Sequence, residues 1–215
     1  MCKLMFTYKP QPVDTVHQLL KKSTNYYQMA SLSKDVSFGM AIQRSNSVET
    51  LRLATLPEEG DLLSLAQLTL PNKRMMAHVR LECGPGETCV KNTHPFYKQS
   101  RYLFMHNGFI PYFNSSTINK TDSEQFMDAW LSIASKGYAL DDSLFKLIKV
   151  VDHPQLLLNL VMVDLQSDEA LIYSHTPHNH SLNIGFPPLH WHSRLGIVTN
   201  FVIGGSRPIE GLVHL

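Results

Sequence analysis

The stretch Ala77–Glu124, AHVRLECGPGETCVKNTHPFYKQSRYLFMHNGFIPYFNSSTINKTDSE, decides the fold of this chain. It sets four polar motifs beside the ends of apolar runs: Arg80, the box Asn92–Phe96, the predicted turn His106–Gly108, and Thr121–Glu124 at the start of a helix. Polar groups at the ends of regular elements suit a binding site better than a core. The stretch offers no obvious nucleophile, and the candidate nucleophile is Cys2, at the other end of the chain.

The length and charge of the chain favour small-molecule chemistry. The 215 residues are enough for one substantial domain, and we expect a single domain over 1–215. The net charge is +1, from 19 basic and 18 acidic residues, so nothing electrostatic indicates a nucleic acid or an anionic membrane as partner.

The cysteines and the apolar runs predict a cytoplasmic protein. Cys2, Cys83 and Cys89 are an odd number in a chain that is poor in cysteine, which favours a reducing compartment and free thiols. Cys83 and Cys89 could pair, but their spacing is not that of a zinc knuckle. The first apolar run is too short for a secretory signal, and no later run is long enough to span a bilayer.

Hydrophobic periodicity predicts more strands than helices. Strands are expected over 3–8, 36–44, 48–54, 75–81, 102–106, 155–164, 170–175 and 196–203, the last being the final strand. Helices are expected from Pro12, around Leu62, from Thr121 and over 141–150, while 24–34 is ambiguous. Two hairpins are predicted, and helices do not alternate one for one with strands, which favours an α+β or layered sandwich over a doubly wound parallel fold.

Cys2 offers both a nucleophile and a base. Cysteine is small enough to permit removal of the initiator Met1, which would expose an α-amine on the residue that carries the thiol. The pKa of an α-amine is about 7.7 to 8.0, so roughly one molecule in seven is unprotonated at pH 7. Such an amine can accept the thiol proton without a histidine partner.

The motifs, taken in order, resemble those of class II glutamine amidotransferases, which belong to the N-terminal-nucleophile hydrolases. The residues that carry the resemblance are Met1-Cys2, His78-Val79-Arg80, Asn92–Phe96, His106-Asn107-Gly108 and Thr121–Glu124. The hairpin LLLNLVMVDLQSDEALIYSH, residues 156–175, is similar to a later strand pair of the family, and the NTHPF box looks like that of the stand-alone, short branch. The resemblance implies a four-layer αββα sandwich of two antiparallel sheets flanked by helices, and no cofactor.

The resemblance also implies roles for single residues. Cys2 attacks the γ-amide of glutamine or of a γ-glutamyl compound, and the Asn107 amide with the Gly108 N–H stabilises the oxyanion. Arg80 binds the substrate α-carboxylate and Asp122 its α-ammonium. The remaining substrate-binding candidates are those that shape the pocket, Asn92, His94 and His106. Each residue also has a simpler interpretation: Asn-Gly as a turn, Asp122 in a capping box, and His78, His94 and His106 as structural histidines.

This chain departs from the family pattern after Arg80. Family members often carry a small residue and a hydroxyl two and three positions after the arginine, whereas this chain has Glu82 and Cys83, which puts the identity of the substrate in doubt. The Asp-Gly-Trp-Gly-like segment of the family is reduced to Val36–Gly39. The loop between Gly108 and Asp122 is brief, which predicts a more open pocket.

Two other functions compete with a glutaminase. The histidine-rich tract His175, His178, His180, His190 and His192 contains two HxH pairs that could hold a metal ion, although a surface loop is the simpler interpretation. A relative that binds γ-glutamyl ligands or a partner without turnover is the second alternative, motivated by Glu82 and Cys83. For the enzyme, the expected partners are a small γ-glutamyl substrate and either an ammonia-accepting synthase subunit or a second copy of the chain.

Overall fold

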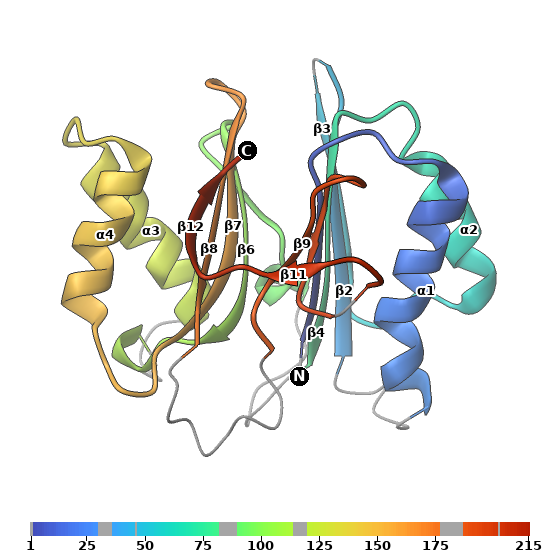
Figure 1. The fold of residues 1–215 in the computed structure, drawn as a ribbon, viewed down its shortest axis with the longest axis horizontal. Helices are drawn as coiled ribbons and strands as arrows, with labels where there is room; N and C mark the ends of the chain where they lie inside the picture. The colour runs from blue at the N-terminus through green and yellow to red at the C-terminus, as the bar shows by residue number, and fades with distance from the viewer. Residues whose placement is uncertain are drawn as a thin grey trace.

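The computed structural model describes residues 2–29, 36–45, 47–81, 90–113, 120–176, 187–201 and 203–215. Within these residues the chain forms two antiparallel sheets, each covered on its outer face by a pair of helices (Figure 1). The protein is therefore an α+β, four-layer αββα sandwich, as predicted.

The larger sheet contains the strands β1 (Lys3–Thr7), β2 (Val36–Gln43), β3 (Val48–Leu53), β4 (Arg74–Leu81), β9 (His190–His192), β10 (Ile197–Thr199) and β11 (Arg207–Pro208). Their order is β11-β9-β10-β1-β4-β2-β3, and every neighbouring pair is antiparallel. The first strand of the chain thus lies in the interior of the sheet.

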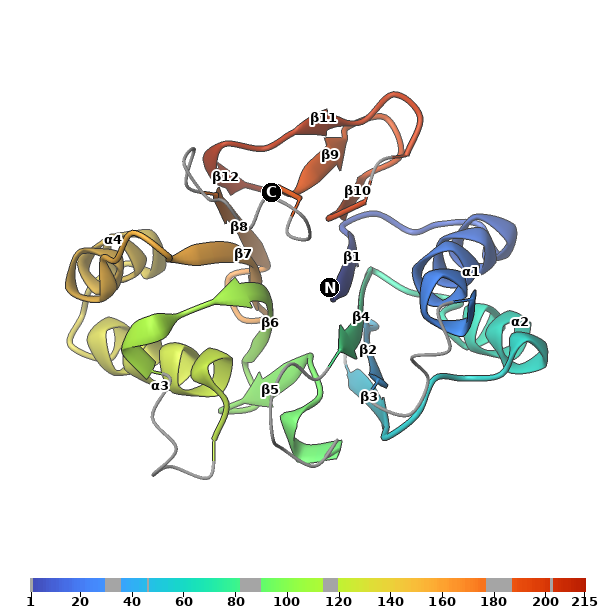
Figure 2. The same ribbon diagram turned by 90° about the horizontal axis from the view of Figure 1, so that it is seen from below.

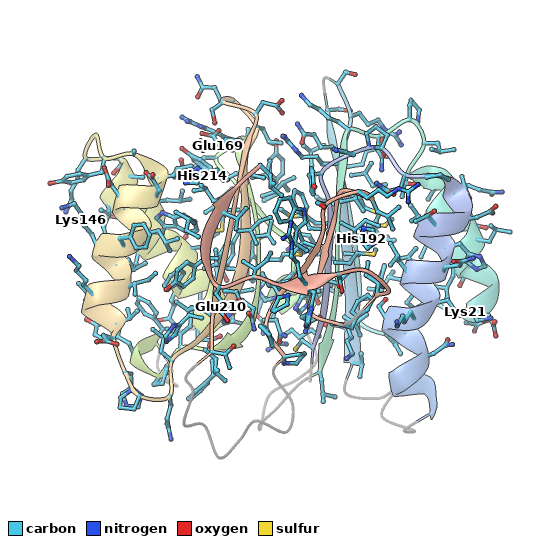
Figure 3. All side chains as sticks on the ribbon, viewed as in Figure 1. Lys21, Lys146, Glu169, His192, Glu210 and His214 are labelled. Atoms are coloured by element: carbon cyan, nitrogen blue, oxygen red, sulfur yellow. The ribbon has the colours of Figure 1, made fainter. Side chains whose placement is uncertain are left out.

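The smaller sheet contains the strands β5 (Phe96–Lys98), β6 (Tyr102–Phe109), β7 (Leu157–Asp164), β8 (Glu169–His175) and β12 (Gly211–His214). Their order is β12-β8-β7-β6-β5, again antiparallel throughout. The last strand is held on β8 by backbone pairing and by a 2.5 Å contact between His214 Nδ1 and Glu169 Oε1, which lie together in Figure 3.

The helices are α1 (Val13–Met29) and α2 (Glu59–Leu68) on the larger sheet, and α3 (Asp122–Ala134) and α4 (Leu140–Val151) on the smaller one; short 3₁₀ turns occupy η2 (Val90–Asn92) and η3 (Pro111–Phe113). Each pair buries the apolar stripe that its sequence predicts. Val16 and Leu20 of α1 pack on the larger sheet, and Phe126 and Trp130 of α3 pack on the smaller one. No helix in the described part of the chain is both long and apolar enough to cross a membrane.

The inner core lies between the two sheets and follows the two-residue period of the strands. Leu4 and Phe6 of β1, Met76 of β4 and Met105 of β6 face inward, and the residues between them face the helices. Because side chains alternate along a strand, every second residue of each strand faces the interface between the sheets.

Three boundaries differ from the sequence predictions. The predicted final strand over 196–203 covers only β10, and β11 and β12 follow it. The ambiguous segment is helical as far as Met29, and its remainder lies outside the described residues. The predicted turn at Asn107-Gly108 is wrong, because both residues belong to β6, where pairing with β7 outweighs the turn preference of Asn-Gly.

Candidate functional site

One end of the interface between the sheets gathers the candidate residues, and we call it the Cys2 end. Here β1 begins, β4 and β6 end and β7 begins, and the N-terminus lies between the two sheets when the molecule is viewed from this side (Figure 2). The parity of the inner core directs a set of polar side chains into this region: Cys2, Ser37, His78, Arg80, Asn107, Asn159 and Asn200. The strands thus bring together residues from both ends of the sequence.

Cys2, just before β1, lies next to Arg80 of the adjacent strand β4. Lys3 pairs with Val79, so one further step of the register sets Cys2 opposite Arg80. The Cys2 Sγ lies 3.8 Å from the carbonyl oxygen of Leu81, which can accept the thiol proton in a hydrogen bond. Burial and the charge of Lys22 lower the pKa of Lys3, and interaction with Cys2 offsets part of that change. The nucleophile predicted from one end of the chain therefore lies beside the arginine predicted from the stretch that decides the fold.

The NTHPF box lies against the larger sheet while its last residue opens β5 of the smaller one. A Cβ on Gly39 of β2 would come within 1.8 Å of the His94 carbonyl oxygen, so only glycine allows the box this close approach. Arg52 of β3 donates to the Pro95 carbonyl at 2.7 Å, and its guanidinium lies 5.7 Å from the centre of the Phe96 ring. The box thus connects the two sheets at the Cys2 end.

His94 is buried between rings and has unused polar atoms. It is 3% exposed, and its ring lies edge-on to His78 and to Phe96, each at 4.6 Å between centroids. Neither of its ring nitrogens makes a hydrogen bond within the described residues. Burial, followed by the nearby His78, His106, Arg80 and Arg52, holds the pKa of His94 well below its usual range, so its ring is neutral.

His78 has the same character. Burial, then the charges of Arg80 and His106, lowers its pKa to about 3, although the backbone of His106 offsets part of this effect. Two neutral imidazoles therefore lie in contact next to the cationic Arg80. They add no positive charge that would compete with the arginine for an anionic group.

Asn107 is the most isolated amide among these candidates. It is 1% exposed, and neither its oxygen nor its nitrogen makes a hydrogen bond within the described residues. Asn159 lies directly opposite on β7 and is equally buried, but its oxygen accepts from Ser174 Oγ at 2.7 Å and its nitrogen donates to the Pro187 carbonyl at 3.2 Å. A buried amide without partners lowers the free energy of unfolding by about 1–3 kcal/mol. This destabilisation applies to Asn107 and not to Asn159.

Gly108 is required by close packing rather than by a turn. A Cβ there would lie 2.0 Å from the Leu157 carbonyl oxygen and 2.6 Å from His106 Nε2. Any side chain at this position would therefore push β6 away from β7, which would displace the backbone beside Asn107.

His106 and Asp122 are linked on the helix side of β6. His106 Nε2 lies 3.0 Å from the Leu157 carbonyl, which can only accept, so this nitrogen carries the proton. Burial lowers the pKa of His106, against the opposing influence of Asp122 and Leu157. Its Nδ1 lies 2.9 Å from Ser123 Oγ, which in turn lies 3.2 Å from Asp122 Oδ1, so Ser123 connects the two residues. Among the predicted substrate-binding residues, His106 therefore faces α3 and not the interface between the sheets.

Asp122 is the first residue of α3, which Thr121 caps, and its carboxylate accepts two backbone hydrogen bonds. Thr121 Oγ1 accepts from the Glu124 N–H at 3.1 Å, which is half of a capping box, whereas the Glu124 carboxylate accepts from Lys98 at 3.0 Å instead of closing the box. The Asp122 carboxylate accepts from Ile110 N–H at 3.1 Å and Ser123 N–H at 2.7 Å. It thereby fixes the chain that follows β6.

Asn92 ends the turn η2, and its side-chain oxygen is buried without a partner in the described part of the chain. Several other predicted features lie outside the described residues: Glu82, Cys83, Cys89, the loop from Asn114, His178 and His180. His190 and His192 lie two residues apart in β9, and among the described residues no group of three His, Cys, Asp or Glu side chains is close enough to hold a metal ion.

Sequence reasoning missed four residues of this region: Ser37, Gly39, Asn159 and Asn200. Ser37 and Gly39 belong to the segment Val36–Gly39, which the sequence indicates only as a reduced family segment. The others are single polar residues in or beside apolar strands, and such an interruption is the one signal that could have indicated them.

No protein-family model and no curated protein matches this chain. Among solved structures it is similar to a glutamine phosphoribosylpyrophosphate amidotransferase from B. subtilis, with a TM-score of 0.61 and 11% identity over 100% of this chain and 49% of that one. It is also similar to a glutamine aminotransferase class-II domain protein from Silicibacter pomeroyi, with a TM-score of 0.54 and 16% identity over 100% and 98% of the two chains. A third structure, described as the allosteric regulatory enzyme of purine biosynthesis, gives a TM-score of 0.60 and 13% identity over 100% and 48%.

The chain thus spans about half the length of two of these proteins and nearly all of the other. At such low identities the likeness establishes the architecture and leaves the chemistry to the residues of this chain. The chain has the fold of the class II glutamine amidotransferases, the fold of the N-terminal-nucleophile hydrolases.

Proposed function

We propose that this protein is an amidohydrolase that uses Cys2, exposed by removal of Met1, to cleave the γ-amide of glutamine or of another γ-glutamyl compound. The observation that carries the proposal is that Cys2, just before β1, lies next to Arg80 of β4, at the end of the sandwich where buried amide and imidazole groups have no partner within the described residues. Unpartnered polar groups in such a place are available to a ligand.

In the proposed reaction the α-amine of Cys2 takes the proton from its own thiol, and the sulfur attacks the carbonyl carbon of the γ-amide. The carbonyl oxygen becomes an oxyanion, which the side-chain amide of Asn107 and the backbone N–H of Gly108 stabilise. The amine then gives its proton to the leaving nitrogen as the C–N bond breaks. Ammonia or an amine departs, and water hydrolyses the γ-glutamyl thioester to glutamate and free thiol.

Arg80 would bind the substrate α-carboxylate, for which its planar guanidinium offers two parallel donors. Asp122 would bind the α-ammonium, while Asn92, His94 and His106 would line or support the pocket. The two neutral histidines beside Arg80 favour this assignment, because they add no further positive charge next to Arg80.

The test is glutamate release from a panel of γ-glutamyl amides, combined with the intact mass of the protein. We expect a mass that lacks Met1, activity reduced to background in Cys2→Ala, and a raised KM with a smaller change in kcat in Arg80→Lys. Cys89→Ala, which removes a different thiol, is the control and should keep its activity. A wild-type rate in Cys2→Ala, or a mature chain that retains Met1, would exclude the proposed mechanism.

The fate of ammonia is a separate part of the proposal. It is either released or delivered to a separate acceptor protein. Equal amounts of free ammonia and glutamate from the isolated protein would indicate direct hydrolysis of glutamine.

A further inference from the structure

Asn200 makes an unusual contact where β10 stops. The last residue of β10, Thr199, pairs with Met5 of β1. The next residue, Asn200, is fully buried and faces the first residues of the chain. Beyond it the chain turns away, with Thr199 Oγ1 donating to the Phe201 carbonyl at 2.5 Å and Phe201 packed in the outer core of the larger sheet.

Since β10 ends at Thr199, the side chain of Asn200 makes the hydrogen bonds to the start of the chain that an extended β10 would have made. Its main-chain N–H donates to the Leu4 carbonyl at 3.2 Å, as in an ordinary antiparallel pair. Its side-chain oxygen accepts the Leu4 N–H at 2.7 Å, and its side-chain nitrogen donates to the Cys2 carbonyl at 2.8 Å. The carboxamide thus supplies the acceptor and the donor that a longer β10 would have supplied.

We propose that Asn200 is a positioning residue for Cys2, an inference that rests on the function proposed above. The carbonyl carbon, the α-amine and the thiol-bearing side chain of Cys2 are all bonded to the same Cα atom. When Asn200 fixes this carbonyl, it limits rotation about the Cα–C bond and so sets the direction of the amine and the sulfur relative to the sheet. Reacting groups need placement within about 0.5 Å, so a loss of this hydrogen bond acts on the chemical step.

Gln11 offers a matched control at the other end of the same strand pair. Its side-chain nitrogen donates to the Leu195 carbonyl at 2.5 Å and the Lys9 carbonyl at 3.1 Å, and the residue is 5% exposed. Both side chains are therefore buried carboxamides that join the β1 and β10 segments through backbone bonds. Of these two side chains, Asn200 donates to the Cys2 carbonyl, whereas Gln11 donates to the Leu195 and Lys9 carbonyls.

The experiment compares Asn200→Asp, Asn200→Ala and Gln11→Glu with the wild type. Asn200→Asp keeps the shape and the acceptor of the side chain but replaces the donor to Cys2 with an anionic oxygen. We expect it to lower kcat for glutamate release by about 10- to 100-fold while KM stays within about threefold. Asn200→Ala should lower kcat in the same direction, and Gln11→Glu should leave both constants within about twofold while lowering the melting temperature.

A second readout does not depend on turnover. The rate at which iodoacetamide alkylates Cys2, followed by peptide mapping, should differ from the wild-type rate by at least about fivefold in the uncharged Asn200→Ala as well as in Asn200→Asp, because the Cys2 backbone is no longer held by its hydrogen bond. It should stay unchanged in Gln11→Glu. A change in Asn200→Asp alone would come from the charge of the new carboxylate and would overturn the positioning role. If Asn200→Asp leaves kcat and alkylation unchanged, or if Gln11→Glu reduces both as strongly, Asn200 has only a structural role.

The two proposals fail in different ways. If the wild type releases no glutamate from any γ-glutamyl amide, the proposed function fails, and the alkylation rates still decide whether Asn200 positions Cys2. If the wild type is active and the Asn200 variants keep its kcat, the positioning role fails and the proposed function stands.

Discussion

The two ends of the sandwich differ in how their polar side chains connect the two sheets. At the end remote from Cys2, Arg74 at the start of β4 donates to Asp168 Oδ1 at 2.6 Å and to its carbonyl at 2.7 Å, and Lys73 contacts Asp168 Oδ2 at 2.5 Å. Asp168 lies in the β7–β8 turn, so these bonds join one sheet to the other. At the Cys2 end, Asn107 and both ring nitrogens of His94 are buried without partners in the described structure.

The bonds at one end contribute to the stability of the fold, whereas the unpartnered groups at the Cys2 end are available to a ligand. Bonds at the Asp168 end hold the sheets together through Arg74, Lys73 and Asp168, although Arg74 Nε and the Asn72 side chain there are also buried without partners in the described residues. Each unpartnered group at the Cys2 end costs about 1–3 kcal/mol of stability, a cost that is retained where the groups serve a ligand. If this comparison is correct, mutations at the two ends should have different signatures.

The largest effect should come from Asn107→Ala. We expect kcat to fall by about 100- to 1,000-fold, as for the loss of one oxyanion donor. The free energy of unfolding should change by less than about 1 kcal/mol, because removing an amide that has no partner in the described residues offsets the cavity left by the shorter side chain. Steady-state kinetics and urea unfolding measure the two quantities. The control is Asn159→Ala, which breaks two bonds and should lose more stability and less kcat; the reverse ranking would contradict the assignment.

The next effect should come from Gly39→Ala. The new Cβ would meet the His94 carbonyl at 1.8 Å, so the NTHPF box must move away from β2, at a cost of about 1–3 kcal/mol in the free energy of unfolding and with a loss of activity. Gly60 of α2 has nothing within 4 Å of the equivalent position, so Gly60→Ala should stabilise the protein by up to about 1 kcal/mol. Equal stability of the two variants would show that the box is not packed as described.

The smallest effect concerns acid stability at the Asp168 end. Burial alone would raise the pKa of Asp164, but hydrogen bonds from Arg101 and the backbone N–H groups of Gln166 and Ser167 hold this pKa below its usual value. A lowered folded-state pKa contributes stability above the unfolded-state pKa near 3.9, and that contribution is lost as the pH falls through the folded-state value.

Asp164→Asn should therefore lower the free energy of unfolding by about 1 kcal/mol at pH 7. The effect is small because Arg101 is partly exposed to solvent, and it should shrink further below about pH 4. Urea unfolding of both proteins between pH 7 and pH 3 measures the difference. A gap in stability that stays constant with pH would show that the Asp164 carboxylate is not the titrating group, and glutaminase activity at pH 7 should be the same in both proteins.

Local sequence patterns predicted most of the fold. Hydrophobic periodicity from Pro12 predicted helix α1, whose Val16, Leu19 and Leu20 are buried, and Thr121 predicted the start of α3. These elements could be predicted because helical periodicity and caps depend on residues a few positions apart. The four-layer arrangement came from the family resemblance, and the structure confirms it.

Long-range contacts could not be predicted in the same way. Asn107-Gly108 has the local signature of a turn, and only its pairing with Asn159 and Leu158 keeps it in a strand. Asn200 reaches Cys2 across 198 positions of sequence, so no window of the chain contains both residues. The roles of Cys2, Arg80, Asn107, Gly108 and Asp122 in catalysis and binding stay predictions.

The interior place of β1 in the larger sheet affects when the protein becomes competent. Its neighbour β10 is made late, since the Leu4–Asn200 contact joins residues 196 positions apart. On a ribosome, the first residues must wait for most of the polypeptide before one side of their ladder can form, and closing so large a loop is slow. The cysteine thus receives its final orientation only after residue 200 has been made, so a chain translated to a shorter length would not yet hold an ordered thiol.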